Sequence, residues 1–232
     1  ARVPYRHRPG GTRRVPFVAQ PFKEKELHRM KTIVIASNNA HKAEEIATAL
    51  AFPGWEFRTL RELGLDSDPA EDADSFEGNA RIKAQAARAA SGGLAVLADD
   101  SGLAVDALDG APGVHSARYA GEPCDDAANN AKLLAELADV PDEKRTGRFV
   151  CTLVFIDEDG TESVARGTIE GAIGREPRGS EGFGYDPLFL PDEYGGTRAL
   201  AEVSQAEKNG ISHRGNALRV LKKALSQSVD ER

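Results

Sequence analysis

The stretch Leu94-Ala95-Val96-Leu97-Ala98-Asp99-Asp100-Ser101-Gly102-Leu103 joins an apolar run to two adjacent carboxylates. The apolar run has the length of a buried strand, so it predicts a strand that ends at Asp99 and Asp100. Open α/β sheets bind their ligands beyond the carboxyl ends of their strands. We therefore expect an α/β protein whose site receives two carboxylates, a hydroxyl and a glycine turn from this strand end. A metal ion and a phosphate group could meet there.

The length and composition are those of a soluble globular protein. The 232 residues suffice for one large domain or two small ones with a substantial core. The chain has an ordinary 40% of hydrophobic and 29% of charged residues, and no apolar stretch approaches the roughly 20 residues that span a bilayer. Its two cysteines, Cys124 and Cys151, are too few for a disulfide framework and lack the spacing of a zinc site. We expect a cytoplasmic protein without membrane contact or redox chemistry.

Charge is distributed unevenly along the chain, whose formal net charge is −7. Residues 1–29 carry a net charge of +6, which leaves −13 for residues 30–232 and argues against nucleic-acid binding by this main part. The segment 1–29 lacks periodic apolar positions and is either a basic arm for nucleic acid or an acidic partner, or a disordered extension. We expect a basic, disordered extension over 1–29 and one folded domain over 30–232.

Strand and helix patterns alternate before a hairpin. Expected strands cover residues 32–36, 55–60, 94–100, 149–156 and 161–167, and expected helices cover residues 43–50, 75–90, 126–138 and 212–225. The last two strands are joined by Asp157-Glu158-Asp159-Gly160 and form a hairpin, which makes the sheet mixed. Two glycine-rich passages, 106–121 and 179–187, are expected to be ordered loops.

The first strand and helix are joined by a polar loop, Ser37 to Lys42. The first backbone N–H groups of a helix are unpaired and its dipole is positive there, so this loop is a natural anion site. Lys42 adds a mobile cation. The pattern GxxxxGK[ST] is absent, so the loop is not a P-loop, and on this motif alone a polar turn with a solvated lysine is the better explanation.

A second group of charged residues surrounds the start of the helix at 75–90. Glu71, Asp72 and Asp74 precede it, and Asn79 and Lys83 lie four residues apart on one of its faces. An acidic helix start also suits the helix dipole without any function, so this segment alone leaves both interpretations open.

The pair Asp99 and Asp100 is harder to explain structurally, because unpaired carboxylates resist burial unless a cation or donors compensate them. Mg²⁺ is usually held by one or two carboxylates, with water and substrate phosphates as its other ligands. Asp100 with Glu71 fits that pattern. Such a metal would polarise a phosphoryl group and help to produce an attacking water.

Aromatic and basic residues gather toward the end of the chain. Phe183 and Tyr185 lie between glycines and could stack on a base, at roughly 1–3 kcal/mol per base. Lys208 and the segment 212–217 add hydrogen-bond donors near a helix start, where Ser212 is a candidate N-cap. Taken singly, each of these residues is equally well explained by packing, capping or solvation.

Taken together and in order, these blocks resemble the non-standard purine nucleoside triphosphate pyrophosphatases, the inosine triphosphatase (RdgB-like) family. The matching blocks are Ser37–Lys42, Glu71 with Ser75–Ala80, Ala98–Leu103, Gly110–Gly113, Ser116–Tyr119, Gly182–Pro187 and Ser212–Gly215. The resemblance covers nearly all of residues 31–226. It implies an elongated α/β fold with a long mixed β-sheet flanked by helices, two lobes around a central active-site cleft, and a homodimer. It also implies Mg²⁺-dependent hydrolysis of ITP, dITP or XTP to the monophosphate and pyrophosphate, which removes deaminated purines from the nucleotide pool.

The resemblance assigns roles to individual residues. It implies that the phosphates are bound by Ser37, Asn38, Asn39, Ala40, His41 and Lys42, with Lys83 nearby and Ser101 as a further substrate contact. It implies that Asp100 is the catalytic carboxylate and that Glu71 and Asp100 hold the metal. It implies a base pocket formed by Phe183, Gly184, Tyr185, Asp186, Lys208, His213 and Arg214.

Two questions stay open at this point. Asp100 is either the general base or a residue that positions metal and water, with Asp99 or the metal assisting deprotonation, because a metal-bound carboxylate is a weak proton acceptor. Donors fixed on the C6 oxygen of hypoxanthine would reject adenine by roughly four orders of magnitude, but guanine must be excluded at its C2 side. Alternative functions are a pyrophosphatase for other modified nucleotides, a nucleotide-binding regulator, and RNA binding through residues 1–29.

Overall fold

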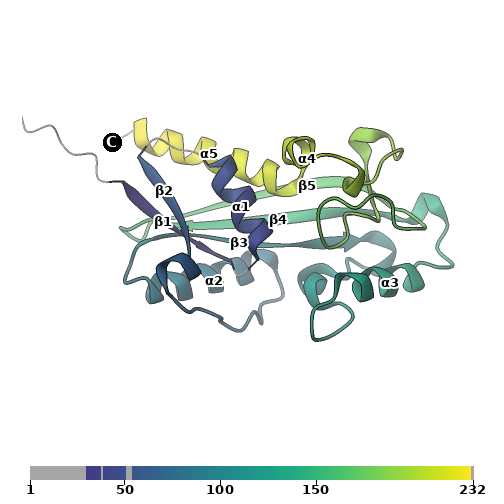
Figure 1. The fold of residues 1–232 in the computed structure, drawn as a ribbon, viewed down its shortest axis with the longest axis horizontal. Coiled ribbons are helices and arrows are strands. Elements are labelled where there is room, and N and C mark those ends of the chain that lie inside the picture. The colour runs from purple at the N-terminus through teal and green to yellow at the C-terminus, as the bar shows by residue number, and fades with distance from the viewer. Residues whose placement is uncertain (1–29, 38, 51–53, 231–232) are drawn as a thin grey trace, which may run out of the picture.

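A computed structural model describes residues 30–37, 39–50 and 54–230 and shows an elongated α/β protein built on one long sheet (Figure 1). Within these residues the sheet has six strands in the order β2-β1-β3-β4-β5-β6. The strands are β1 (Lys31–Ala36), β2 (Trp55–Thr59), β3 (Ala95–Val105), β4 (Thr146–Ile156), β5 (Glu162–Ile173) and β6 (Phe189–Pro191). β1 is parallel to β2 and β3, whereas the pairs β3–β4, β4–β5 and β5–β6 are antiparallel. The predicted mixed sheet is confirmed.

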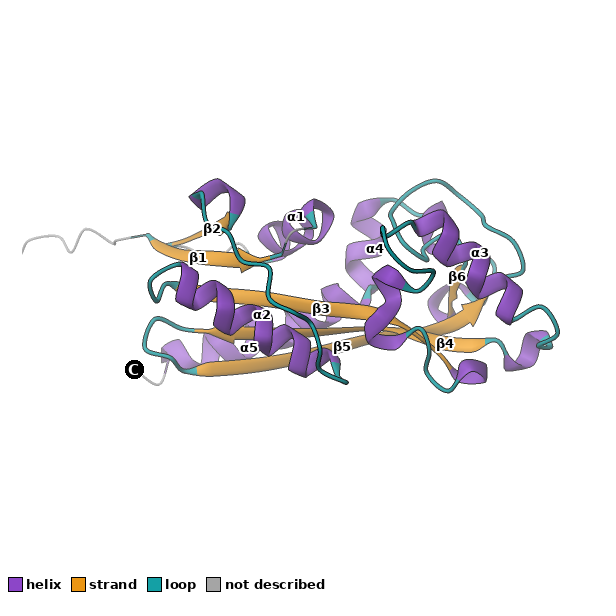
Figure 2. Ribbon diagram, turned by 90° about the horizontal axis from the view of Figure 1, so that it is seen from below, coloured by secondary structure: helices purple, strands orange, loops and turns teal. Residues whose placement is uncertain are grey.

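Helices flank the sheet on both sides. They are α1 (Ala40–Ala49), α2 (Phe76–Ala90), α3 (Asp126–Glu136), α4 (Gln205–Ile211) and α5 (His213–Asp230). Figure 1 shows α4 and α5 above the sheet, α2 and α3 below it and α1 running across the strands, and Figure 2 shows α2 lying along the strands. The side chains of Asn39, Ser75 and Asp125 cap the starts of α1, α2 and α3. At α2, for example, the Oγ of Ser75 accepts a hydrogen bond from the N–H of Gly78 at 3.2 Å. The short helix α4 was not predicted.

The glycine-rich passage 106–121 is a mostly ordered connection, as expected. It contains two 3₁₀ helices, η2 (Asp106–Leu108) and η3 (Gly113–Arg118). η3 packs on β3, and the Oγ of Ser116 accepts a hydrogen bond from the N–H of Leu103 at 2.9 Å. The hairpin of β4 and β5 is longer at both outer ends than the sequence pattern predicts.

The prediction that β3 ends at Asp99 and Asp100 is wrong. β3 continues to Val105, and its pairing with β4 runs without interruption from Val96 opposite Ile156 to Val105 opposite Gly147. The strand that ends here is its neighbour β1, whose last pair is Ala36 with Ala98. The two carboxylates therefore lie at the carboxyl end of β1 but inside β3. The predicted glycine turn is also absent, because Gly102 lies within β3.

Adjacent residues of a strand point to opposite faces of the sheet. Asp99 shares its face with Leu97 and Cys151, in the core cluster that α1 and α5 cover. Asp100 shares its face with Ala98, in the cluster that α2 covers. The two neighbouring carboxylates therefore point to opposite faces of the sheet.

Three apolar clusters hold the layers together. One lies between the sheet and α1 and α5, a second lies between the sheet and the alanines of α2, and the third fills the far end of the molecule near α3 and β6. Within the described residues, no helix combines the length and apolar character needed to cross a membrane. The prediction made for residues 1–29 lies outside the described part of the chain.

Gly167 on β5 marks the closest approach between the sheet and α5. A Cβ at this position would collide with the carbonyl oxygen of His213 and the backbone nitrogen of Ala217. We expect Gly167→Ala to lower the free energy of unfolding by about 1–3 kcal/mol, because overpacking forces the backbone to shift. Urea denaturation measures this change.

Gly210 in α4 provides the matched control, because a Cβ there meets nothing within 4 Å. Gly210→Ala is expected to be neutral or to stabilise by up to about 1 kcal/mol, since alanine favours the helix. Equal destabilisation by both substitutions would contradict the role assigned to the close approach.

Candidate active site

A cavity of about 460 Å³ opens where β1 ends. Its walls come from the end of β1 and the start of α1, the loop before α2, the middle of β3, and η3. The polar and charged residues among its walls are Ser37, Asn39, Lys42, Ser67, Asp68, Glu71, Lys83, Asp99, Asp100, Ser101, Arg118 and Cys124. The structure thus brings the predicted phosphate loop, Lys83, Ser101 and the predicted metal ligands to one cavity.

The polar loop after β1 supplies one wall of this cavity. The side chain of Asn39 caps α1 by accepting from the N–H of Lys42 at 3.1 Å, which keeps the helix start at the cavity. The Lys42 ammonium contacts the Oδ1 of Asp99 at 2.6 Å and the Oγ of Ser101 at 3.5 Å. Asn38 and the side chains of Ala40 and His41 lie outside the described part.

Lys83 connects the two predicted metal ligands. Its ammonium group lies 2.7 Å from the Oδ1 of Asp100 and 3.0 Å from the Oε2 of Glu71. Burial opposes the charge on Lys83, but the carboxylates of Asp100 and Glu71 outweigh burial and raise the pKa of the ammonium. Both carboxylates therefore face the same cation.

Asp100 has one carboxylate oxygen that makes no hydrogen bond within the described part of the protein. Its side chain is 8% exposed, and its Oδ2 is buried without a hydrogen-bond partner among the described residues. Burial raises the pKa of Asp100 from 3.8 to about 6, against the opposing effect of Lys83. A buried, unpaired carboxylate oxygen in a cavity wall can bind a cation or accept a proton.

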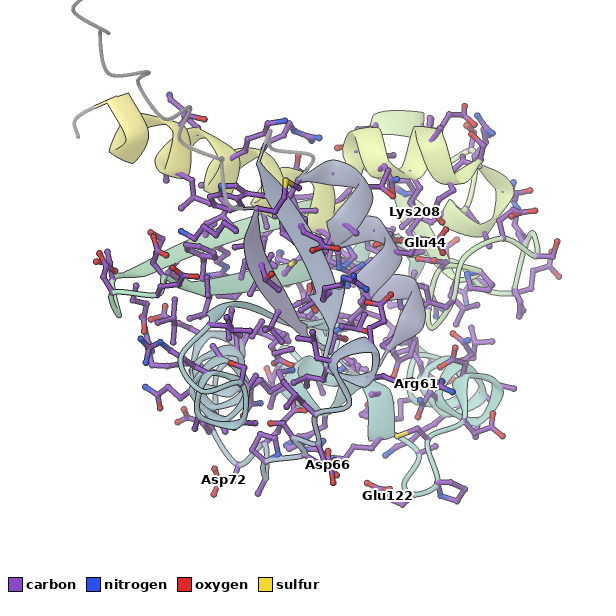
Figure 3. All side chains as sticks on the ribbon, turned by 60° about the vertical axis from the view of Figure 1, so that its left-hand side comes forward. Glu44, Arg61, Asp66, Asp72, Glu122 and Lys208 are labelled. Atoms are coloured by element: carbon purple, nitrogen blue, oxygen red, sulfur yellow. The ribbon has the colours of Figure 1, made fainter. Side chains whose placement is uncertain are left out.

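The donor set fits a magnesium ion only if substrate completes the coordination. Among the described residues, no three His, Cys, Asp or Glu side chains form a group that could hold a metal. Mg²⁺ needs no such group, since one or two carboxylates with substrate phosphates and water suffice. Asp100, with its free oxygen, and Glu71 fit that requirement. Asp72, which the sequence groups with Glu71, is exposed and is not among the residues that line the cavity (Figure 3).

Asp99 is fully buried and paired on the opposite face of β3. The guanidinium of Arg214 donates to its Oδ2 at 2.9 Å, and Lys42 contacts its Oδ1. Although burial favours the neutral acid, Arg214 and Lys42 hold the pKa of Asp99 well below its usual value. Asp99 therefore stays charged within the physiological range of pH.

Part of the predicted base pocket gathers around Lys208 of α4, on the opposite side of the molecule from Asp72 in Figure 3. The buried ammonium of Lys208 lies 2.6 Å from the Oδ2 of Asp186 and 4.6 Å from the centre of the Phe183 ring. The same Asp186 oxygen accepts from the N–H of Phe183 at 2.9 Å and so fixes this loop. Burial nevertheless raises the pKa of Asp186. Gly184 donates its N–H to Asp126 of α3 at 2.7 Å.

The structure places two members of the predicted base pocket in the core. Tyr185 is 4% exposed, and its hydroxyl donates to the carbonyl of Ser116 at 2.8 Å. A ring buried in this way has little free surface for stacking on a base. Phe183, by contrast, is only partly buried. His213 is 4% exposed and stacks on Phe149, and burial lowers its pKa well below 6.5. Its Nδ1 has no hydrogen-bond partner.

Three residues of this region escaped the sequence analysis. Glu45 is buried in α1, where it pairs with Arg214 and lies 3.8 Å from Lys208. It follows Lys42 by three residues on a helix, so helical spacing could have indicated it. Arg118 and Cys124 also line the cavity; Arg118 lies in the matching block Ser116–Tyr119 but received no role there, and Cys124 was considered only for disulfide and zinc chemistry.

A mixed sheet with helices on both faces, whose strand end opens into a cavity lined by lysines, carboxylates and a helix start, defines an α/β protein with a charged cavity. The model of the Ham1 family matches residues 33–224, and the chain belongs to this family. A dITP/XTP pyrophosphatase from Exiguobacterium sibiricum is 49% identical over 199 residues, which cover 86% of this chain and 99% of that protein. A dITP/XTP pyrophosphatase from Nocardia farcinica is 49% identical over 206 residues, covering 87% and 98%.

Solved structures of the family share this fold. The structure of a HAM1 protein from Coxiella burnetii is 40% identical and superposes with a TM-score of 0.77, covering 85% of this chain and all of that one. The fold expected from the resemblance is therefore confirmed.

Proposed function

We propose that this protein hydrolyses non-standard purine nucleoside triphosphates, namely ITP, dITP and XTP, to the monophosphate and pyrophosphate. The observation that carries the proposal is the unpaired, buried oxygen of Asp100 in a cavity that also holds Lys42 and Lys83. Family membership and the names of the relatives support the same reaction. The reaction removes deaminated purines from the nucleotide pool.

The lysines would bind the phosphate chain. The start of α1 presents unpaired backbone N–H groups and a positive dipole, and Lys42 lies in its first turn. Lys83 reaches the cavity from the other face of the sheet and contacts Asp100 directly. An incoming phosphate would share these ammonium groups with their carboxylates, so substrate binding would loosen both ion pairs.

Asp100 and Glu71 would hold a Mg²⁺ ion. When bound, the ion supplies positive charge that polarises the phosphoryl group under attack. Without a cation, burial holds the pKa of Asp100 near 6, so the carboxyl can accept a proton close to neutral pH. The free Oδ2 of Asp100 is the atom available for either role.

The base would be recognised on the side of Phe183 and Lys208. Hypoxanthine and xanthine carry an acceptor oxygen at C6, where adenine carries an amino group. Lys208 is buried and held by Asp186, so its ammonium is a fixed donor. A fixed buried donor that faces an amino group is left unpaired, which can reject adenine by roughly four orders of magnitude.

Pyrophosphate release from ITP, dITP, XTP, ATP and GTP, with and without Mg²⁺, tests the proposal. ITP, dITP and XTP should be hydrolysed at least about a hundredfold faster than ATP and GTP. Equal rates on ITP and ATP would refute the base-side assignment. Efficient hydrolysis of another modified nucleotide, with none of ITP, would favour a related pyrophosphatase, and binding without turnover would favour a regulator.

Glu71→Gln should raise the Mg²⁺ concentration needed for half-maximal activity. Because the substitution removes one of two carboxylates, we expect an increase of about 10- to 100-fold, with a smaller loss at saturating Mg²⁺. Mg²⁺ titrations of the initial rate measure this shift.

Asp72→Asn removes the same charge from the same loop at an exposed position, so it is the matched control. Its Mg²⁺ requirement should match that of the unaltered protein. An equal shift in both variants would show that Glu71 acts only through the general charge of the loop.

A further inference from the structure

Asp99 accepts four donors from four separate parts of the chain. Its Oδ1 accepts from the Lys42 ammonium and from the Ser101 hydroxyl, each at 2.6 Å. Its Oδ2 accepts from the Nε of Arg214 at 2.9 Å and from the Sγ of Cys151 at 3.1 Å. The side chain is fully buried. Both oxygens are thus fully engaged, in contrast to the free oxygen of Asp100.

The two cations on Asp99 belong to different halves of the proposed site. Lys42 begins α1 and lines the cavity assigned to the phosphates. Arg214 begins α5, and its guanidinium lies 6.0 Å from the centre of the Phe183 ring on the base side. Arg214 also contacts the hydroxyl of Ser101 at 3.2 Å. One carboxylate therefore connects the start of α1 with the start of α5.

We infer that Asp99 is a positioning residue that fixes the phosphate-side ammonium of Lys42 and the base-side guanidinium of Arg214 to the same strand. The inference rests on the proposed function and assigns no proton transfer to Asp99. β3 is paired with β4 on both sides of Asp99, so the carboxylate cannot move independently of the sheet. Asp99 thus holds both cations on β3, and Glu45 of α1 also pairs with Arg214, so these two carboxylates together set the spacing between the cations and hence between the bound base and its phosphates.

The inference is tested on the 232-residue chain with two half-ligands, each of which represents one part of the substrate. Inosine probes the base side, and inorganic tripolyphosphate probes the phosphate side. Lys42→Met should weaken tripolyphosphate about tenfold or more and leave inosine unchanged. Asp99→Asn should weaken both half-ligands about tenfold or more, because a neutral amide loses two charge-assisted hydrogen bonds. Isothermal calorimetry gives both dissociation constants. Loss of only one half-ligand, or of neither, in Asp99→Asn would overturn the inference.

A double variant covers the case in which Asp99→Asn alone does not fold. Lys42→Met combined with Asp99→Asn removes one charge of each sign and so preserves the balance of buried charge. It should bind inosine about tenfold more weakly than Lys42→Met alone, since Arg214 keeps its pairing with Glu45 but loses its charged partner on β3. Equal inosine binding by these two variants would contradict the inference.

Asp142→Asn is the control for a general effect of removing an aspartate, because the Asp142 side chain is 78% exposed. It should bind both half-ligands like the unaltered chain. The proposed function has its own test, independent of the half-ligands: it would be wrong if the unaltered chain released no pyrophosphate from ITP.

Discussion

Asp100→Asn is expected to lower the rate of pyrophosphate release from ITP by about 10³-fold or more. Asparagine has nearly the same shape, and its oxygen can still accept from Lys83, but it can neither carry the charge that binds a cation nor accept a proton. Loss of a general base or of a main electrostatic contact costs about 10²- to 10⁴-fold, and Asp100 is assigned both capacities. Steady-state kinetics at saturating Mg²⁺ measures the loss, and near-normal turnover would exclude both roles.

The same substitution is expected to stabilise the metal-free protein at pH 8. The pKa of Asp100 is 3.8 when unfolded and about 6 when folded, so the stability present below pH 3.8 is lost as pH rises through 6. Asparagine does not ionise and avoids that loss, which amounts to about 1–3 kcal/mol. Urea denaturation should show little difference between variant and unaltered protein near pH 4 and a growing difference up to pH 8.

Asp142→Asn, an exposed substitution of the same kind, should change neither turnover nor the pH dependence of stability. If Asp100→Asn were less stable than the unaltered protein at pH 8, the buried carboxyl would be a net stabilising group. The assignment of Asp100 as a residue kept for function at a cost in stability would then be wrong.

Arg214→Met is expected to lower the free energy of unfolding by about 3–5 kcal/mol. The guanidinium is 1% exposed and pairs with two buried carboxylates, those of Asp99 and Glu45. Methionine fills much of the volume, but it leaves both carboxylates without this partner, and breaking a buried pair costs that much. Loss of Arg214 should also raise the pKa of Asp99, whose depression it helps to maintain. Part of the lost stability should therefore return as the pH is lowered, because Asp99 then binds a proton more readily than in the unaltered protein.

Arg175→Met is the matched control, because Arg175 is 53% exposed and pairs with an exposed carboxylate. Its effect should stay within about 1 kcal/mol. Similar losses in the two arginine variants would mean that the pairing of Arg214 contributes nothing beyond a surface ion pair. Guanidinium chloride is unsuitable for this comparison, because its ions screen charges, so both variants are compared in urea.

Local sequence patterns predicted most helices and strands but not the length of β3. The capping serine at residue 75 and the glycines after residue 91 bound α2 closely, because caps act within one turn. The apolar run before Asp99 predicts only the first part of β3. The strand continues because Lys42, Arg214 and Lys83 compensate the two carboxylates, and these cations come from helices distant in sequence. A local pattern contains no such information.

The sequence identified residues of the candidate site better than it predicted how these residues are arranged. The family resemblance implied that Lys83 lies near the phosphates, and the structure places it between Asp100 and Glu71. The separation of Asp99 from Asp100 depends on β3 continuing, since a two-residue period applies only inside a strand. Tyr185 resembled a stacking residue, yet its ring belongs to the core and its hydroxyl serves Ser116. The local sequence around Tyr185 is compatible with a core ring and with a stacking ring, so it does not distinguish the two.

The unequal lengths of β1 and β3 have a consequence for how the site could change. β1 spans six residues and β3 spans eleven, so β1 pairs only with the first part of β3, and Pro112 bridges Ala104 farther along. The cavity occupies the place where a longer first strand would continue to pair. Its depth therefore depends on where one short strand stops, because Ser37 and Asn39, which follow the end of β1, are among its walls.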